Sequence, residues 1–96
     1  MSAEVLIYTT SYCPYCTAAK QLLRKKNVTF EEIGVDGRDE MRDWLVKASS
    51  QRTVPQIFIN GKSMGGFSDV SALDKAGKLD GLLAEAPPAG REALPR

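Results

Sequence analysis

Residues 5–16 have the sequence VLIYTTSYCPYC and carry the strongest structural signal in this chain. The apolar run at residues 5–8 is rich in β-branched side chains and is typical of a strand buried on both faces of a sheet. Cys13 and Cys16 follow this run in the sequence and are three residues apart, with Pro14 where a helix would begin. Proline is tolerated in the first helical turn because its missing N–H would have no partner there. The stretch therefore predicts a strand followed by a helix, with Cys13 at the helix N-terminus.

Further segments extend this unit along the chain. Hydrophobic residues at helical spacing continue through residues 15–23, while lysine and arginine face the other side. Residues 28–35 alternate imperfectly between apolar and polar side chains, which favours a second strand. Asp36 is the expected cap of a second helix. The first strand, the first helix and the second strand should form a right-handed βαβ unit with parallel strands.

The next part of the chain changes character. Residues 56–59 form an apolar run, and Asn60-Gly61 is typical of the turn of a β-hairpin. Residues 62–64 should therefore return as the second strand of the hairpin. Ser68 is the expected N-cap of a short helix, and residues 78–83 can add a last helical turn or two.

The length of the chain and the composition of residues 86–96 indicate the extent of the domain. The 96 residues suit one domain, since domains typically contain about 100–150 residues. We assign the domain to residues 1–85. Residues 86–96 contain several helix-breaking prolines and a glycine, so we expect a disordered tail that buries nothing.

The composition excludes several classes of function. With 13 Lys+Arg against 12 Asp+Glu, the formal charge of +1 argues against a general nucleic-acid binder and against attachment to acidic lipid by charge. No apolar run approaches the ~20 residues that span a bilayer. The N-terminus, with its early Glu4, lacks the layout of a secretory signal, so we expect a cytoplasmic protein. The chain has no histidine, which removes Ser-His-Asp and Cys-His triads.

Cys13 and Cys16 are the two cysteines of the chain. A disulfide between them closes too small a loop to stabilise a fold. They can be two small buried residues, half of a metal site, or a redox dithiol; a structural zinc site normally needs four nitrogen or sulfur ligands. The positive end of a helix favours a thiolate at Cys13, while Cys16 lies one turn deeper. This arrangement favours disulfide exchange, in which Cys13 attacks and Cys16 resolves.

Thr53-Val54-Pro55 precedes the third predicted strand. The proline can simply start that strand. Alternatively, it follows a cis peptide bond and presents the backbone N–H and C=O of Val54 to an extended peptide. Beside a cysteine pair of this kind, the second interpretation is favoured.

After the cysteine pair and the Thr-Val-Pro motif, the segment Gly65-Gly66-Phe67-Ser68-Asp69 is a third feature that suggests a function. It can be a flexible loop with a helix cap. It can also be an anion site, in which the glycines let the backbone approach a ligand and the helix N-terminus binds a carboxylate. Asp69 can pair with an ammonium group. A site that accepts both charges suits the α-carboxylate and α-amine of an amino-acid-like ligand.

Together, the three features resemble the dithiol class of the glutaredoxin family, over residues 4–83. The cysteine motif, the Thr-Val-Pro motif and the paired glycines followed by Ser-Asp occur in the order and at the spacing of that family. The resemblance implies an α/β, thioredoxin-like fold with a four-stranded mixed sheet of order 2-1-3-4, flanked by helices. It also implies glutathione as reductant, with no metal.

The resemblance assigns roles to individual residues. Cys13 is implied as the nucleophile and Cys16 as the resolving thiol. Val54 is implied to pair with the cysteine of glutathione through its backbone, and Gly66, Ser68 and Asp69 are implied to receive the γ-glutamyl end. The implied contacts of glutathione are Tyr15, Thr53, Val54, Pro55, Gly66, Ser68 and Asp69.

The sequence departs from the family pattern at some positions. Many members carry a lysine where this chain has Thr10, and that lysine meets the glycine carboxylate of glutathione. Arg42 matches another family position that contacts this carboxylate, and Arg52 is a second candidate. Phe67 replaces a cysteine that often follows the paired glycines.

The resemblance implies a monomeric, glutathione-dependent oxidoreductase that reduces protein disulfides and protein–glutathione mixed disulfides, without nucleic-acid or membrane partners. Two alternatives stay open. One is a related redoxin reduced by thioredoxin reductase, which the Gly-Gly-x-Ser-Asp site argues against. The other is a dimeric carrier of a 2Fe–2S cluster held by Cys13 and glutathione.

Overall fold

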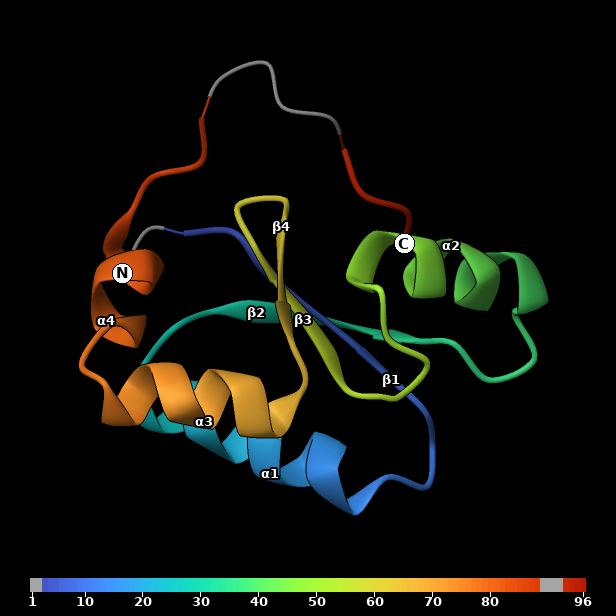
Figure 1. Ribbon diagram of the computed structural model, residues 1–96, viewed down its shortest axis with the longest axis horizontal. Helices are drawn as coiled ribbons and strands as arrows, with labels where there is room; N and C mark the ends of the chain where they lie inside the picture. Colours follow the sequence, from blue (N-terminus) through green and yellow to red (C-terminus); the bar gives the residue numbers. More distant parts are fainter. Residues whose placement is uncertain (1–2, 89–92) are drawn as a thin grey trace.

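The computed structural model describes residues 3–88 and 93–96. Its strands and helices follow the order expected from the sequence, and Figure 1 shows their arrangement. In chain order they are β1 (Val5–Thr9), α1 (Pro14–Lys25), β2 (Phe30–Gly34), α2 (Asp39–Ser49), β3 (Gln56–Ile59), β4 (Lys62–Gly65), α3 (Phe67–Lys75) and α4 (Leu79–Ala84). No helix in the described ranges is both long and apolar enough to cross a membrane.

The strands form one sheet of order β2-β1-β3-β4, as predicted. β1 and β2 are parallel, with Val5 opposite Phe30 and Thr9 opposite Gly34. β1 and β3 are antiparallel, and so are β3 and β4. Because β1 and β2 are parallel neighbours, the loops after their carboxyl ends lie at the same edge of the sheet. The cysteine motif follows β1 directly, so it also lies at this edge.

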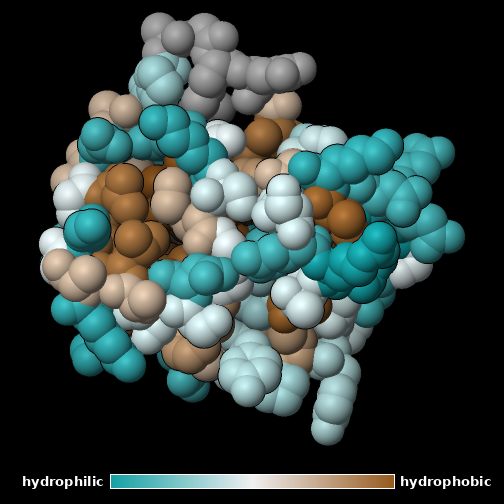
Figure 2. Space-filling view, in the orientation of Figure 1, coloured by the Kyte–Doolittle hydropathy of each residue, from teal (hydrophilic) through white to brown (hydrophobic). Residues whose placement is uncertain are grey.

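β1 is the centre of the sheet and supplies both sides of the hydrophobic core. Successive side chains of a strand point to opposite faces. Val5 and Ile7 pack with buried residues of α1, α3 and α4. Leu6 and Tyr8 pack with the buried side of α2. Helices therefore cover both faces of the sheet (Figure 1), and the space-filling view shows hydrophilic residues gathered over α2 (Figure 2).

Asp36 does not cap α2, contrary to the expectation from the sequence. The residue at the N-cap is Arg38, and its side chain makes no capping hydrogen bond. The Asp36 carboxylate instead accepts hydrogen bonds from the backbone N–H and the hydroxyl of Ser11, each at 2.7 Å. These bonds hold the pKa of Asp36 below its ordinary value. The parallel pairing of β1 with β2 explains the difference, because it brings the loop with Ser11 beside Asp36.

Ser68 is also not the N-cap of α3. The helix begins at Phe67, with Gly66 at the N-cap. Ser68 therefore lies inside the first turn, where it is exposed. Asp69 is the third residue of the helix, and its carboxylate accepts a hydrogen bond from the backbone N–H of the N-cap residue Gly66 at 3.0 Å.

Residues 93–96 lie against the α2 side of the sheet, although the sequence suggested that residues 86–96 form a tail that buries nothing. Residues 89–92 of that tail lie outside the described residues. Leu94 packs against the core cluster around Leu6 and Tyr8. The hydroxyl of Tyr8 donates to the carbonyl of Pro95 at 2.6 Å. The guanidinium of Arg96 lies 2.9 Å from the carboxylate of Glu31. The side chain of Tyr8 is fully buried, and the carbonyl of Pro95 gives its hydroxyl a partner.

Tyr8 should make stability fall at high pH. Burial raises the pKa of its hydroxyl to about 12 from an ordinary value of 10.0. The neutral hydroxyl therefore contributes fully below pH 10.0, and the contribution is lost as pH rises toward about 12. We expect Tyr8→Phe to lower the free energy of unfolding by about 1 kcal/mol at neutral pH, for the lost hydrogen bond.

Urea unfolding at neutral and alkaline pH checks this prediction. Phenylalanine keeps the ring contacts with Trp44 and Phe58, so the variant should fold. Its stability should decline less steeply than that of the wild type above pH 10.0. An equally steep decline in both proteins would contradict the prediction.

Candidate active site at the Cys13–Cys16 pair

Cys13 and Cys16 form a disulfide, with their Cα atoms 5.2 Å apart. Cys13 occupies the N-cap of α1, and Pro14 is the first helical residue, as predicted. The backbone N–H of Cys16 donates to Sγ of Cys13 at 3.0 Å, a bond that favours negative charge on that sulfur. Cys13 is half-buried, whereas Cys16 is only 2% exposed. An attacking thiol can therefore reach Cys13 but not Cys16.

The loop before β3 faces this sulfur. The Val54–Pro55 peptide bond is cis, as predicted. The carbonyl oxygen of Val54 lies 3.7 Å from Sγ of Cys13. Pro55 is buried and leads directly into β3, so the central sheet fixes the position of the loop. The backbone of Val54 is thus available to an extended peptide whose sulfur meets Cys13.

A groove of about 310 Å³ extends from this loop to the start of α3. It brings together Tyr15, Thr53, Val54, Pro55, Gly66, Ser68 and Asp69, which the resemblance implied as glutathione contacts, but not Arg42 or Arg52. It also includes two residues that were not assigned to the site, Gln51 and Phe67. The lining residues are Tyr15, Gln51, Thr53, Val54, Pro55, Gly66, Phe67, Ser68 and Asp69.

Phe67 forms one wall of the groove together with Tyr15. Their rings are stacked, with centroids 6.4 Å apart and an interplanar angle of 27°. Tyr15 is 68% exposed, so the outer part of this wall is open to a ligand. The sequence shows Phe67 beside the paired glycines, but its contact with Tyr15 depends on the packing of α3 against α1.

Polar contacts hold Asp69 at the far end of the groove. Its Oδ2 accepts hydrogen bonds from the N–H of Gly66 at 3.0 Å and from the side-chain amide of Gln51 at 3.3 Å. The amide of Gln56, which is fully buried, donates to Oε1 of Gln51 at 2.8 Å and to the carbonyl of Thr53 at 2.9 Å. Gln51 thus links the cis-proline loop to Asp69. No local pattern marks it, because its partner Asp69 lies 18 residues away.

Gly65 makes the position of Asp69 sterically accessible. Its φ angle is +85°, a conformation that other residues rarely adopt. A Cβ atom at Gly65 would collide with the Asp69 carboxylate. The first of the paired glycines is therefore required at this point by both backbone conformation and space.

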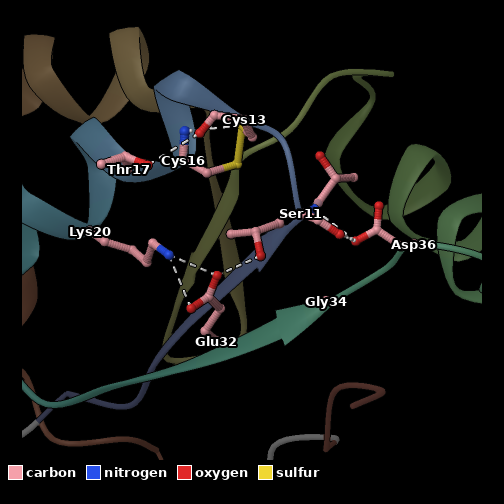
Figure 3. A pocket seen from close by; sticks show the side chains of 10 residues that line it. Ser11, Cys13, Cys16, Thr17, Lys20, Glu32, Gly34 and Asp36 are labelled. Carbon is pink, nitrogen blue, oxygen red and sulfur yellow. Dashed lines mark hydrogen bonds and ion pairs between the residues drawn. A yellow bond between two sulfur atoms is a disulfide. The ribbon is translucent and has the colours of Figure 1, made fainter.

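A second, polar cavity of about 360 Å³ lies where α1, β1 and β2 meet beside the disulfide (Figure 3). Both cysteines line it, and so do Thr10, Lys20 and Glu32. The Glu32 carboxylate accepts a hydrogen bond from the Thr9 hydroxyl at 2.7 Å and lies 3.0 Å from Nζ of Lys20. The hydrogen bond from Thr9 is the main reason that the pKa of Glu32 lies below its ordinary value. Lys20 and Glu32 belong to none of the motifs that the sequence offered as functional.

The two arginines proposed as partners of a carboxylate lie outside the lining of the groove. Arg42 and Arg52 are both exposed. The positive charge of Arg42 contributes to the lowered pKa of Asp36, which places it toward the side of the molecule where Thr10 and Asp36 line the polar cavity. Within residues 3–88 and 93–96, no group of three or more His, Cys, Asp or Glu residues is placed to hold a metal ion.

Known proteins resemble this chain over most of its length. The sequence model of the glutaredoxin family matches residues 5–64. A glutaredoxin of Pseudomonas aeruginosa is 52% identical over 80 residues, which cover 83% of this chain and 95% of that protein. Glutaredoxin 3 of Escherichia coli is 49% identical over 81 residues, which cover 84% of this chain and 98% of that protein.

Solved structures agree with the sequence comparisons. The crystal structure of a wheat glutaredoxin has a TM-score of 0.81 and 42% identity, and the match covers 91% of this chain and 83% of that one. A buckwheat glutaredoxin–glutathione complex has a TM-score of 0.80 and 31% identity, and the match covers 84% and 76% of the two chains. The sheet order is that of a thioredoxin-like fold, and the cysteine pair is consistent with thiol–disulfide oxidoreduction. The chain belongs to the glutaredoxin family.

Proposed function

We propose that this protein is a glutathione-dependent oxidoreductase that reduces protein disulfides and protein–glutathione mixed disulfides through Cys13 and Cys16. One observation carries the proposal. A groove runs from the Val54 backbone, which faces Sγ of Cys13, to Asp69 at the start of α3. Glutathione is an extended tripeptide with a thiol in its middle and a free amino-acid group at its γ-glutamyl end, and it matches this groove in both respects.

The groove offers a partner for each group of glutathione. The backbone of Val54 can pair with the cysteine residue of glutathione, as an added strand pairs with a sheet edge. The first turn of α3 offers the backbone N–H groups of Ser68 and its neighbours to the γ-glutamyl carboxylate. The Asp69 carboxylate can bind the ammonium group beside it. The buckwheat glutaredoxin–glutathione complex, which has the same fold, supports this ligand.

Two routes of exchange follow from the different exposure of the sulfurs. In the dithiol route, the Cys13 thiolate attacks a protein disulfide and releases one protein thiolate. Cys16 then attacks Sγ of Cys13, releases the second protein thiolate and closes the intramolecular disulfide. In the monothiol route, Cys13 attacks the glutathione sulfur of a mixed disulfide and releases the protein thiolate. A thiolate of glutathione then attacks the glutathionylated Cys13, which yields glutathione disulfide and the Cys13 thiolate.

A coupled assay with a small mixed disulfide tests the proposal. We expect turnover when glutathione and glutathione reductase supply the electrons, and little turnover when thioredoxin reductase supplies them. The reverse result would assign the protein to the redoxins that thioredoxin reductase serves, and the γ-glutamyl site would need another explanation. The cytoplasmic location and the monomeric state belong to the same proposal; size-exclusion chromatography checks the second.

Arg42 should supply the positive charge that many family members have as a lysine at the position of Thr10. The guanidinium can hold the glycine carboxylate of glutathione through two hydrogen bonds. Because Arg42 is exposed, we expect Arg42→Ala to raise the KM for glutathione about threefold to fivefold and to leave the fold intact. The salt dependence of KM should shrink, since a screened ion pair has been removed.

Two matched variants make the Arg42 test specific. Lys47→Ala removes a positive charge from an exposed position of the same helix and should leave KM unchanged. Arg52→Ala tests the second candidate. If Arg42→Ala keeps the wild-type KM at low salt while Arg52→Ala raises it, the role belongs to Arg52.

A further inference from the structure

The polar cavity beside the disulfide contains an ion pair that the exchange reaction described above does not use. Nζ of Lys20 lies 3.0 and 3.2 Å from the two carboxylate oxygens of Glu32. The Thr9 hydroxyl, whose residue is 2% exposed, fixes the same carboxylate from β1. Lys20 and Glu32 line the cavity together with Cys13 and Cys16. Figure 3 shows their side chains pointing toward one another from α1 and β2, beneath the disulfide.

Helix geometry places Lys20 on the same face of α1 as Cys16. The two residues are four positions apart, and such positions are neighbours on a helix surface, about 5–6 Å apart between Cβ atoms. Side chains on a helix lean toward its N-terminus, so the lysine reaches back toward the cysteine. The side chain of Lys20 is only 20% exposed, which limits the screening of its charge by water.

We propose that the Lys20–Glu32 pair controls how readily Cys16 carries negative charge, and that the Lys20 ammonium stabilises the Cys16 thiolate when the disulfide opens. Cys16 is 2% exposed, so water gives its thiolate little solvation and a nearby cation must replace it. Glu32 has two opposing effects. It holds the ammonium in place, and its own negative charge weakens the attraction between Lys20 and the thiolate.

The pair acts at one defined step. When a reductant thiolate attacks Sγ of Cys13, a new S–S bond forms and the Cys13–Cys16 bond breaks. Sγ of Cys16 leaves with the bonding electron pair as a thiolate, and it later takes a proton from water. A thiol with a lower pKa leaves faster, so stabilising the thiolate accelerates this step. The proposal rests on disulfide exchange by the two cysteines, but it does not depend on glutathione.

Other charged groups around the cavity contribute less. Asp36 lines it from the loop after β2, but its carboxylate is bound to Ser11. Arg24 lies one turn beyond Lys20 on α1, and its positive charge contributes to the lowered pKa of Glu32. Its guanidinium carbon lies over the ring of Phe30, 5.7 Å from the ring centroid. Lys20 and Glu32 are therefore the charges whose removal should change the pKa of the Cys16 thiol most.

The two single variants should have opposite effects on the thiol of Cys16. In a Cys13→Ser background, thiolate absorbance against pH reports the pKa of Cys16 alone. Lys20→Met leaves Glu32 without its partner and should raise that pKa by about half a unit to one unit. Glu32→Gln releases the ammonium and should lower it by a similar amount, while glutamine can still accept the hydrogen bond from Thr9. The double variant should return close to the starting value.

A rate measurement tests the same idea in the protein with both cysteines. Dithiothreitol reduces the oxidised protein without using the γ-glutamyl site, so the result is independent of the proposed glutathione dependence. Lys20→Met should slow this reduction about threefold, and Glu32→Gln should accelerate it. Lys20→Arg keeps the charge and should preserve most of the rate.

The control is Lys25→Met, which removes an exposed positive charge from the same helix outside the cavity lining. It should change neither the pKa of Cys16 nor the rate. A purely structural ion pair would make Lys20→Met and Glu32→Gln act in the same direction, through lower stability. Shifts of the same sign in both variants, or no shift in either, would overturn the proposal.

Discussion

Replacement of Cys13 by serine is expected to abolish reduction of both protein disulfides and mixed disulfides. Cys13 lies at the N-cap of α1, is half-buried and faces the Val54 end of the groove, whereas Cys16 is almost fully buried. Both routes begin with attack by the Cys13 thiolate. A hydroxyl at this position is a far weaker nucleophile, because it stays protonated at neutral pH. We expect a fall in kcat/KM of at least about a thousandfold, to the background of the assay.

Cys16→Ser should separate the two routes. The monothiol route uses Cys13 and glutathione alone, so this variant should keep at least about half of the wild-type activity toward a glutathionylated substrate. It should lose the reduction of protein disulfides that need an intramolecular resolving thiol. Parallel assays with a glutathionylated protein and with a disulfide-bonded protein measure the separation. A Cys16→Ser variant that is inactive toward mixed disulfides would contradict the proposed roles.

The sequence predicts the fold because its strongest signals are local. The buried run of β1, the helical spacing after the cysteines and the Asn60-Gly61 turn each determine one element. Their order allows few topologies once the first crossover is right-handed. The position of Cys13 at the start of α1 is confirmed for this reason. The sheet order, which the resemblance to glutaredoxins implied, is confirmed as well.

The features that the sequence did not predict depend on contacts between distant segments. Asp36 is of a residue type that commonly caps helices, but the parallel pairing of β1 and β2 brings Ser11 to its carboxylate. Gln51 has no motif of its own, and its place in the groove follows from Asp69 and Gln56. The contacts of Pro95 depend on the buried hydroxyl of Tyr8. In each case a polar group is satisfied by a partner far away in sequence, and periodicity carries no information about that partner.

Gly65→Ala is expected to weaken glutathione binding strongly, whereas Gly77→Ala is expected to lower stability alone. Both glycines have positive φ angles, +85° at Gly65 and +75° at Gly77, so alanine at either position costs about 1–2 kcal/mol of backbone strain. Their surroundings differ. A Cβ atom at Gly65 would collide with the Asp69 carboxylate, whereas no heavy atom lies within 4 Å of a Cβ atom at Gly77.

The displaced Asp69 carboxylate should raise the KM for glutathione about tenfold in Gly65→Ala, which corresponds to about 1.4 kcal/mol of binding free energy. Its kcat at saturating glutathione should stay near that of the wild type, since the disulfide and the Val54 backbone lie at the other end of the groove. Reduction by dithiothreitol should also be unchanged. Gly77→Ala should show a comparable loss of stability in urea and a wild-type KM. If both variants raise KM equally, backbone strain alone explains the effect and Asp69 is not the partner of the γ-glutamyl end.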